Sequence, residues 1–436
     1  MLTIQTFRDR ADEIRTATAQ RGTEAPVDRI VELDAERSPL LTEVETMRAD
    51  RNRAGKAIGA ARDADERQRL IDEQRAVAGK LDELEAKLTE IDDELNERLL
   101  EVPNLFHPDV PIGPEAANEV ILHGDSAAGT EERVHAPIPI SEWPDPETEP
   151  GLKPHWELGE QLGIIDFERG VKLSGANFYL LKGDGARLQR ALISWMLDLH
   201  REQGYSEVYP PVLVNESALI GTSQLPKFAD TMFQTTDGRW LIPTSEVPVT
   251  NMYADEILEA GSLPIHHTAY SPCFRREQFS AGSAVRGIKR GYQFDKVEMV
   301  RFEEPDRSWD ALETLLEHAL ETVRTLGLRY RVLRLASEDL TFASAMTYDI
   351  EVWAPGAHEW LEVSSVSNFL DFQARRANLR YRSDDGVAHL HTLNGSGLGM
   401  PRTVAAVLEQ HQLEDGSIEL PAALRPYLGG QASIEA

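Results

Sequence analysis

A basic loop between two predicted strands is the stretch of this sequence best suited to carry out chemistry. Residues 273–298 read CFRREQFSAGSAVRGIKRGYQFDKVE, and residues 269–276 and 291–302 are predicted to form antiparallel strands on either side. The basic residues of the loop are Arg286, Lys289 and Arg290. The loop is too polar for a core and longer than the roughly two to five residues of a tight hairpin. Such loops usually contact an anionic group, although a solvated hairpin tip would have the same composition.

Three segments resemble the motifs of class II aminoacyl-tRNA synthetases and, in detail, those of the seryl-tRNA synthetases. As this sequence has them, they are TSEVP at 244–248, FRRE at 274–277 with Gln293, Phe294 and Glu298 beyond the loop, and NGSGL at 394–398 with Arg402 in the predicted helix that follows. The first is similar to the serine-binding loop of that family, the second to motif 2 and the third to motif 3. The resemblance extends over nearly the whole chain.

Activation of an amino acid by ATP explains why such motifs contain arginine. A carboxylate must attack the α-phosphorus of a tetra-anionic nucleotide, so guanidinium groups and magnesium must neutralise the triphosphate. Arginine suits this role because its planar fork binds two phosphate oxygens at once. The resemblance implies two catalytic arginines: Arg275 would hold the α-phosphate and the serine carboxylate, and Arg402 the far end of the triphosphate. A structural salt bridge is the alternative for each.

The resemblance also implies how the rest of ATP is bound. Glu277 would receive the adenine amino group, and Phe294 would stack on the adenine ring unless it is a buried core residue. Glu362 and Ser365 offer the hard oxygen ligands that suit Mg²⁺, and the similar family segment holds the magnesium that bridges the phosphates; an ordinary surface strand end is the alternative. The implied ATP-binding residues are Arg275, Arg276, Glu277, Phe294, Glu362, Val363, Ser364, Ser365 and Arg402.

A synthetase for serine must distinguish it from alanine, glycine and threonine. A site that hydrogen-bonds the hydroxyl rejects alanine strongly, because its polar groups would otherwise be left unpaired. The resemblance implies that Glu298 and Ser396 contact the hydroxyl and that Thr244 and Glu246 bind the α-amino group. The implied serine-binding residues are Thr244, Ser245, Glu246, Arg275, Glu298 and Ser396.

The first hundred residues are predicted to be helical. After a short amphipathic helix, two long helices carry apolar residues at alternating spacings of three and four, which is the seam of a coiled coil. The seam residues are Ile30, Leu33, Leu40, Val44, Met47, Ala54 and Ile58, then Leu70, Val77, Leu81, Leu84, Leu88, Ile91 and Leu95. The sequence thus predicts a coiled-coil hairpin over about 27–102, with its tip near 63–65, in an N-terminal domain of residues 1–103.

Such a hairpin is either a dimerisation or spacer element or, as the resemblance implies, a tRNA-binding arm. In seryl-tRNA synthetases the arm grips the long variable arm and the elbow of the tRNA. The implied tRNA-binding residues are Arg48, Arg51, Arg53 and Lys56 of the hairpin and Arg286 of the basic loop.

Residues 104–436 are predicted to form the catalytic domain, which begins with a proline-rich segment over 103–155. Pro103 ends the second long helix, because an interior proline costs about 3 kcal/mol. Helices are expected over 188–200 and 310–326, and strands over 205–215, 329–335, 348–353 and 360–366. Because no βαβ alternation occurs, the fold class is α+β: a two-helix coiled-coil arm and a class II catalytic domain on a mainly antiparallel sheet. No Walker or Rossmann glycine motif is present.

The composition is typical of a soluble globular protein, but the net charge is unusual for one that would bind RNA. The formal net charge is −29 over 436 residues. Phosphate backbones need a basic surface, so any RNA site must be a local patch on an acidic body; adaptation to a salty cytoplasm is another reason for the charge. The sequence contains no run of 18 apolar residues, so no membrane span is predicted. The single cysteine, Cys273, is expected in the core, and we expect a cytoplasmic protein with no zinc.

The histidines are expected to be structural rather than metal ligands. His266 and His267 are assigned to the surface, and His389 and His391 to one face of a strand, where spacing by two places them together. No third ligand is identifiable.

The expected function is ATP-dependent activation of L-serine to seryl-adenylate and transfer to the 3′ end of the serine tRNA, with the selenocysteine tRNA as a further acceptor. A homodimer is implied because the helix over 188–200 and the strand after it resemble motif 1. One departure is GSAVRG at 282–287, where the family commonly has GRDTRG in the loop that reaches the acceptor stem. The alternatives are a paralogue that serves a carrier protein and a non-catalytic coiled-coil RNA-binding protein.

Overall fold

A computed structural model describes residues 1–147, 151–276 and 286–435. The chain forms two compact units: residues 1–19 with 23–103, and residues 20–22 with 104–436. Among the described residues, no helix is both long enough and apolar enough to cross a membrane.

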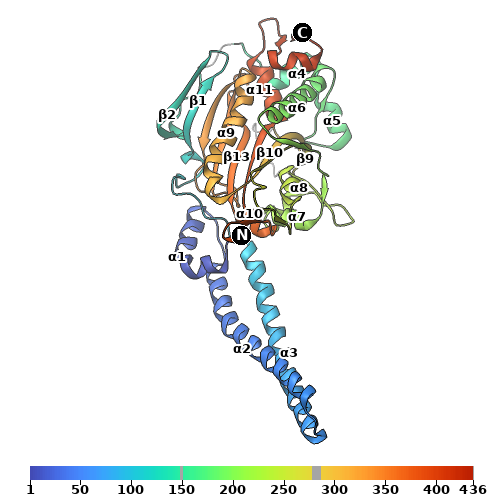
Figure 1. The fold of residues 1–436 in the computed structure, drawn as a ribbon. Coiled ribbons are helices and arrows are strands. Elements are labelled where there is room, and N and C mark those ends of the chain that lie inside the picture. Colours follow the sequence, from blue (N-terminus) through green and yellow to red (C-terminus); the bar gives the residue numbers. More distant parts are fainter. Residues whose placement is uncertain (148–150, 277–285, 436) are drawn as a thin grey trace. The chain divides into compact units, whose positions relative to one another are not determined.

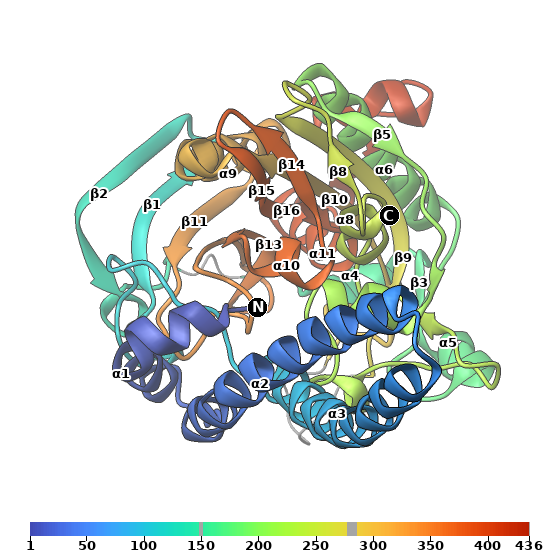
Figure 2. The same ribbon diagram turned by 60° about the horizontal axis from the view of Figure 1, so that its bottom comes forward.

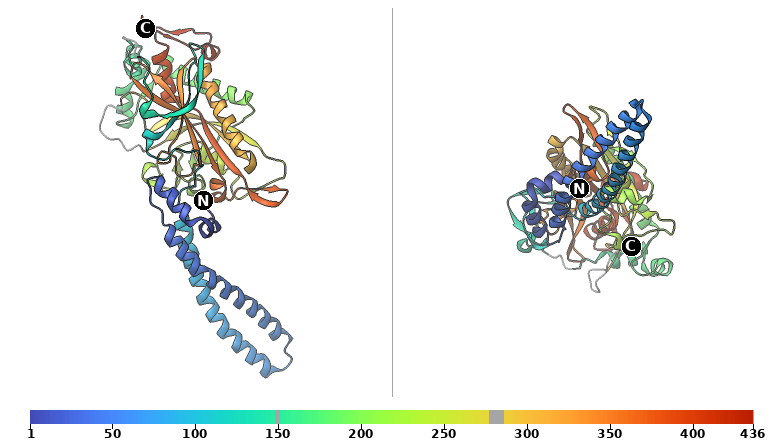
Figure 3. Two further views of the ribbon diagram at one scale, coloured as in Figure 1. Left: turned by 90° about the vertical axis from the view of Figure 1, so that its left-hand side faces the viewer. Right: turned by 90° about the horizontal axis from the view of Figure 1, so that it is seen from below.

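The first unit is a short helix followed by a helical hairpin. The helices are α1 (Ile4–Gln20), α2 (Val27–Ala60) and α3 (Ala64–Leu100). Asp63 caps α3 by accepting a hydrogen bond from the backbone N–H of Glu66 at 2.9 Å, so the turn lies where the sequence predicts it. The predicted seam is buried near the base of the hairpin, as at Ile30, Val44 and Leu81. Nearer the tip its residues are only half-buried, and the two helices lie apart there (Figure 3).

The second unit contains a sheet of nine strands within the described residues (Figure 1). In their order across the sheet they are β2 (Thr130–Pro139), β1 (Glu119–Asp125), β11 (Arg329–Arg334), β12 (Met346–Ala354), β13 (Glu359–Leu370), β16 (His391–Gly399), β10 (Gln293–Glu303), β9 (Ile265–Phe274) and β5 (Ser206–Val208). Every neighbouring pair is antiparallel except β5 and β9. The predicted α+β class with a mainly antiparallel sheet is therefore confirmed.

Shorter elements surround this twisted sheet (Figure 2). The small sheets pair β14 (Arg380–Ser383) with both β15 (Gly386–His389) and β8 (Ile257–Leu258), β17 (Ile418–Glu419) with β18 (Ser433–Ile434), β3 (Ile165–Asp166) with β4 (Leu180–Leu181), and β6 (Leu213–Val214) with β7 (Trp240–Leu241). The α-helices are α4 (His155–Gln161), α5 (Phe167–Ser174), α6 (Asp184–Glu202), α7 (Glu216–Gly221), α8 (Glu246–Asn251), α9 (Ser308–Thr325), α10 (Phe372–Arg376) and α11 (Met400–Gln410). The 3₁₀ turns are η1 (Glu115–Ala117), η2 (Ile140–Glu142), η3 (Ala229–Thr231), η5 (Pro305–Arg307) and η6 (Ala422–Leu428).

Strand alternation along β10 separates the core from the functional face. Val297 and Met299 point into the main core, which α6, α9 and α11 share. Lys296 and Glu298 therefore point to the opposite face. Cys273 of β9 is fully buried, as expected, and burial raises the pKa of its thiol.

Two expectations about histidines are wrong. His267 is buried and hydrogen-bonds to the Tyr253 hydroxyl at 2.9 Å, while His266 contacts the Glu303 carboxylate at 2.8 Å. His389 and His391 do not share a face of one strand, because β15 ends at the first and β16 begins at the second. The strand predicted over 205–215, with an interruption at Pro210 and Pro211, forms β5 and β6 on either side of these two prolines, which cannot donate to a ladder.

Candidate active site

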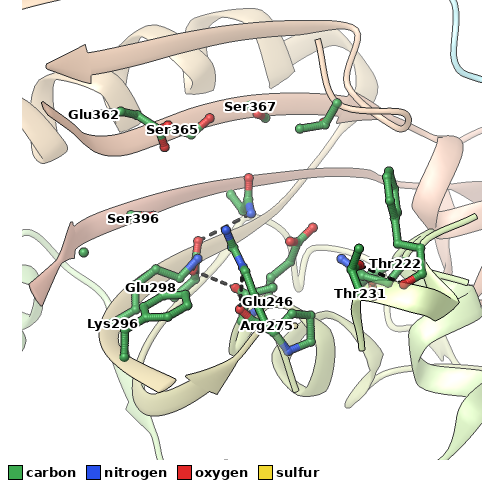
Figure 4. A pocket seen from close by; sticks show the side chains of 18 of the residues that line it. Thr222, Thr231, Glu246, Arg275, Lys296, Glu298, Glu362, Ser365, Ser367 and Ser396 are labelled. Atoms are coloured by element: carbon green, nitrogen blue, oxygen red, sulfur yellow. Dashed lines mark hydrogen bonds and ion pairs between the residues drawn. The ribbon is translucent and has the colours of Figure 1, made fainter. Parts of the chain in front are cut away.

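A cavity of about 720 Å³ lies on the polar face of the large sheet (Figure 4). It brings together most of the residues selected from the sequence motifs. Those that line it are Thr244, Glu246, Arg275, Arg276, Phe294, Glu298, Glu362, Val363, Ser365, Ser396 and Arg402. The sheet register explains part of this convergence, since β10 pairs with β16 so that Glu298 lies directly opposite Ser396.

A β-bulge decides which residues of β13 face the cavity. Ser365 pairs with Asp349 and Ser364 with Ile350, but Glu362 pairs with Glu351, which leaves Val363 as the extra residue. Glu362 and Ser365 consequently face the cavity together, although simple alternation would separate residues three apart. The Ser364 side chain points elsewhere: it is buried and donates to the backbone oxygen of Ser396 at 2.7 Å.

Two further residues selected from the sequence are not among the described residues that line the cavity. Ser245 is a fully buried residue that precedes α8 as its N-cap. Arg286 lies with its guanidinium carbon 5.1 Å from the ring centroid of Trp156, a cation–π contact. Glu277 falls outside the described residues, as do Ser283 and Ala284 of the altered loop.

Glu298 is buried and is held by three neighbours. The Thr244 hydroxyl donates to its Oε2 at 2.9 Å, and Asn394 Nδ2 donates to its Oε1 at 3.4 Å. The Lys296 ammonium forms an ion pair with the same carboxylate. Asn394 belongs to the NGSGL motif but was given no role there, and Lys296 was missed. Spacing by two along β10 is a signal that could have placed Lys296 beside Glu298.

Glu246 forms the second acidic position of the cavity. Its Oε1 accepts a 2.7 Å hydrogen bond from Gln373 Nε2, and Thr392 Oγ1 donates to the Gln373 Oε1 at 2.7 Å. Burial, together with the negative charge of Glu298, raises the pKa of Glu246 to about 7, although Gln373 and nearby cations oppose that shift. Gln373 was also missed, because no sequence pattern links α10 to α8.

The other end of the cavity combines an arginine with a carboxylate. Arg402 Nη1 donates to the backbone oxygen of Glu362 at 2.7 Å and lies 3.2 Å from its carboxylate. Enclosure by the cavity walls would raise the pKa of Glu362, whose side chain is still 46% exposed, but the charges of Arg402 and Arg275 outweigh that effect and hold the pKa below its ordinary value. Beside them, burial and the charge of Glu362 raise the pKa of Asp349 well above its usual range.

These oxygens fit a magnesium ion that also binds phosphates and water. Glu362 and Ser365 supply two hard ligands on one wall, and Mg²⁺ commonly keeps one or two protein ligands and completes its shell with substrate and water. Within the described ranges, no cluster of three or more His, Cys, Asp or Glu side chains is placed to hold a metal.

A fully buried pair fixes the segment that follows the basic loop. The side chains of His155 and Glu409 are completely inaccessible, and His155 Nδ1 lies 2.6 Å from Glu409 Oε1. The backbone N–H of Ile288 donates to His155 Nε2 at 3.2 Å. A Cβ at Gly287, whose φ is +91°, would lie 2.0 Å from that nitrogen, so only glycine fits. The pair thereby positions Lys289, whose ammonium lies 2.6 Å from Glu359 Oε2.

Comparison with known proteins gives consistent matches over the whole chain. Residues 1–106 match the family model of the seryl-tRNA synthetase N-terminal domain, and residues 233–411 match the class II tRNA synthetase core domain (G, H, P, S and T). The serine–tRNA ligase of Chloroflexus aurantiacus is 52% identical over 438 residues and covers 100% of both chains; that of Thermomicrobium roseum is 52% identical over 100% of this chain and 95% of its own.

Solved structures agree. Seryl-tRNA synthetase from Pyrococcus horikoshii complexed with ATP has a TM-score of 0.88 at 34% identity, with coverage of 100% of this chain and 99% of that one. The cytoplasmic serine–tRNA ligase from Naegleria fowleri in complex with AMP has a TM-score of 0.84 at 25% identity and the same coverage.

Proposed function

The chain belongs to the seryl-tRNA synthetase family of class II enzymes, and from that premise we propose that it activates L-serine with ATP and transfers the serine to the 3′ end of the serine tRNA. We propose the selenocysteine tRNA as a further acceptor and a homodimer as the active form. The convergence of Thr244, Glu246, Glu298 and Ser396 beside Arg275 in one cavity is the observation that carries this proposal.

The cavity residues divide into a serine end and a phosphate end. Serine would lie with its α-ammonium toward Glu246 and Thr244 and its hydroxyl toward Glu298 and Ser396. Its carboxylate would then lie beside Arg275 and attack the α-phosphorus, forming an oxygen–phosphorus bond while the bond to the β-phosphate breaks and pyrophosphate leaves. Arg275 neutralises the charge that develops on the α-phosphate.

The phosphate end would hold the rest of ATP. Arg402, which contacts Glu362, would face the far phosphates, and Arg276 and Val363 line the same cavity. When bound at Glu362 and Ser365, a magnesium ion would supply charge neutralisation for the leaving pyrophosphate. One face of the Phe294 ring is covered by the Arg275 guanidinium at 5.1 Å, so an adenine ring would stack on the other face.

The helical hairpin is proposed to bind the tRNA. Its outer part, residues 48–80, holds nine Lys and Arg against six Asp and Glu, whereas the whole chain has 45 against 74. Some of this positive charge is already paired, since Arg48 contacts Glu85 at 2.6 Å and Arg53 contacts Asp50. We propose that Arg51 and Lys56 make the stronger phosphate contacts there and that Arg286 contributes from the basic loop.

Amino-acid-dependent ATP–pyrophosphate exchange, measured with each of the twenty amino acids, tests the activation step. We expect serine alone to support rapid exchange, and purified serine tRNA to be charged in a second assay. Exchange with serine but transfer only to a carrier protein would favour the paralogue instead. No exchange with any amino acid would contradict an enzymatic function.

Ser396→Ala is expected to raise the KM for serine and to narrow the preference for serine over alanine. Loss of one buried hydroxyl partner is worth about 1–3 kcal/mol, which corresponds to a change of roughly fivefold to over a hundredfold. Exchange kinetics with serine and alanine measure both effects, and Ser262→Ala, at an exposed position, is the control. Unchanged discrimination would mean that other groups recognise the hydroxyl.

The KM for serine is expected to rise as the pH falls below about 7, where Glu246 of the free enzyme becomes protonated. A neutral carboxyl cannot pair with the α-ammonium, so KM should rise by up to about tenfold per pH unit. The pKa of Glu246 is about 7 in the folded protein and 4.5 in the unfolded chain, so the free energy of unfolding falls as the pH rises from about 4.5 through about 7. Serine binds the ionised form of Glu246, so it should raise the melting temperature more at high pH than at low pH.

Glu246→Gln separates this effect from other titrations. The variant should have a high KM for serine that varies little across the same pH range, and serine should raise its melting temperature little at any pH. A wild-type KM that is constant from about pH 6 to 8 would contradict the assignment of Glu246 to the α-ammonium.

A further inference from the structure

The buried pair of His155 and Glu409 joins parts of the second unit that are far apart in the sequence. Glu409 Oε1 accepts a hydrogen bond from the backbone N–H of His155 at 2.9 Å and also contacts its ring, while Oε2 accepts from the backbone N–H groups of Gly356 and Ala357 at 2.9 and 3.0 Å. The pair thus links α4, the turn between β12 and β13, and α11, which packs beside α4 (Figure 1). Because a buried carboxylate is costly without such donors, these contacts hold one another in place.

The hydrogen bonds of His155 define the protonation of its ring. The backbone N–H of Ile288 donates to Nε2 at 3.2 Å, so this nitrogen carries no proton. The ring proton therefore lies on Nδ1 and is donated to the Glu409 carboxylate at 2.6 Å. The imidazole is a neutral bridge that connects the backbone at Ile288 to a side chain of α11.

Arg402 makes a second connection between α11 and the same segment. It lies seven residues before Glu409, so the two residues share one face of the helix and lie about 10 Å apart along its axis. Arg402 Nε donates to the backbone oxygen of Lys289 at 3.3 Å. The helix therefore contacts this segment at two adjacent residues, through His155 at Ile288 and directly through Arg402 at Lys289.

This closed set of contacts borders the phosphate end of the cavity. Residues 289–291 and Arg402 line the cavity there. The serine end is held by other elements, since Gln373 of α10 donates to Glu246 at 2.7 Å. A change at His155 should therefore disturb the phosphate end before it disturbs the serine end.

We propose that the His155–Glu409 pair is a positioning device for Arg402, which it holds toward the far phosphates of ATP. The proposal rests on the proposed function, which places those phosphates at Arg402. Neither His155 nor Glu409 is among the described residues that line the cavity, so the pair acts on ATP only through α11 and the segment 288–289. The Arg402 side chain is 29% exposed, and a long side chain that is fixed before ATP arrives loses less rotamer freedom on binding.

His155→Asn tests the proposal because it removes only one of the two ring contacts. The asparagine amide nitrogen can replace Nδ1 as the donor to Glu409, whereas no acceptor remains for the backbone N–H of Ile288. In serine-dependent ATP–pyrophosphate exchange, the KM for ATP should rise by about tenfold or more, while the KM for serine should stay within about twofold of the wild-type value. Equilibrium binding of ATP should weaken by a similar factor, and binding of AMP, which lacks the far phosphates, should weaken much less.

Two controls separate positioning from a general loss of stability. His135→Asn makes the same substitution at an exposed histidine of β2 and should change neither KM. Tyr348→Phe removes a 2.8 Å hydrogen bond to Glu313 from a buried side chain of the same unit. It should lower the melting temperature and leave the KM for ATP unchanged.

Gly287→Ala displaces the segment by a different route. Its Cβ would lie 2.0 Å from His155 Nε2, so the segment must move away from the ring, and the KM for ATP should rise as in His155→Asn. The double variant lacks the ring atom that causes the clash. Its KM for ATP should therefore be lower than the product of the two single effects predicts, whereas two unrelated defects would multiply.

Arg402→Ala tests whether the pair acts through Arg402. When the guanidinium is absent, its position no longer matters. Addition of His155→Asn to Arg402→Ala should therefore change the affinity for ATP little further. A full His155→Asn effect in this background would contradict the proposed route.

Other results would also overturn the proposal. Unchanged affinity for ATP in both His155→Asn and Gly287→Ala would mean that the pair only stabilises the fold. Equal weakening of ATP and AMP binding would assign the pair to the adenosine part of the site, and equal rises in the KM for ATP and serine would indicate general damage. A wild-type protein that binds ATP but shows no serine-dependent exchange would contradict the proposed function, while the binding of ATP and AMP by the variants would still test the positioning of Arg402.

Discussion

Arg275→Ala is expected to abolish serine-dependent ATP–pyrophosphate exchange in a protein that remains folded. Arg275 lines the cavity between Glu246 and Glu362, where it would bind both the serine carboxylate and the α-phosphate. Removal of one preorganised donor from a transition state typically costs about 3–4 kcal/mol, a loss of at least roughly 10²–10³-fold. Because this guanidinium would contact both reacting groups, we expect a loss at or beyond the upper end of that range.

Two further variants make this result specific. Arg275→Lys keeps the charge but not the planar fork, so it should recover only part of the activity. Arg382→Ala is a matched control, because Arg382 is 54% exposed and its ion pair with Glu259 is long, at 3.8 Å. Circular dichroism and thermal unfolding should be similar for all three variants. Near-normal exchange in Arg275→Ala would contradict the assignment of the active site.

Shortening the helical hairpin is expected to separate activation from charging. Removal of residues 47–78, with Thr46 joined to Gly79 by about four glycines, retains the part of the seam that is buried, including Val44 and Leu81. It also retains the 2.8 Å contact between Glu43 and Lys80 across the hairpin. Because the removed segment lies in a different compact unit from the cavity, exchange with serine should persist.

Charging of serine tRNA by the shortened protein should fall on the order of a hundredfold in kcat/KM, because several phosphate contacts are lost together. Charging by the intact protein should weaken steeply with salt, and charging by the shortened protein should respond less. Replacement of Arg51 and Lys56 by glutamine in the full-length chain should reproduce part of the loss, while Lys87→Gln serves as the control. Undiminished charging by the shortened protein would restore the dimerisation or spacer interpretation of the hairpin.

The sequence by itself determined which segments carry the chemistry and which local elements they form. Apolar spacings of three and four predict the helical hairpin, because a helix places those residues on one face. Asp63 caps α3 because its carboxylate can accept a hydrogen bond from a backbone N–H in the first turn of the helix. The alternation of β10 likewise sends Val297 into the core and Glu298 to the opposite face. Each of these features depends on residues close together in the chain.

Local rules failed where distant parts of the chain outweighed them. The rule that ends a helix at Pro103 would also end one at Pro39, yet α2 continues through Pro39 to Ala60. Packing along the buried seam, as at Ile30 and Val44, continues on both sides of this proline and stabilises the helix. A helix-propensity difference of a few kcal/mol is therefore a weak guide to where a helix ends when tertiary contacts of similar energy are present.

Only the tertiary structure decided which side chains meet in the cavity and in what state of charge. The bulge at Val363 turns Ser365 toward the cavity and Ser364 away from it, and that bulge exists only through pairing with β12. Gln373 reaches Glu246 across 127 residues of chain, and Thr392 orients it. The pKa of Glu246 depends on burial and on the charge of Glu298, both set by elements far apart in the sequence. Desolvation and long-range pairing belong to the folded molecule, so no local pattern of residues encodes them.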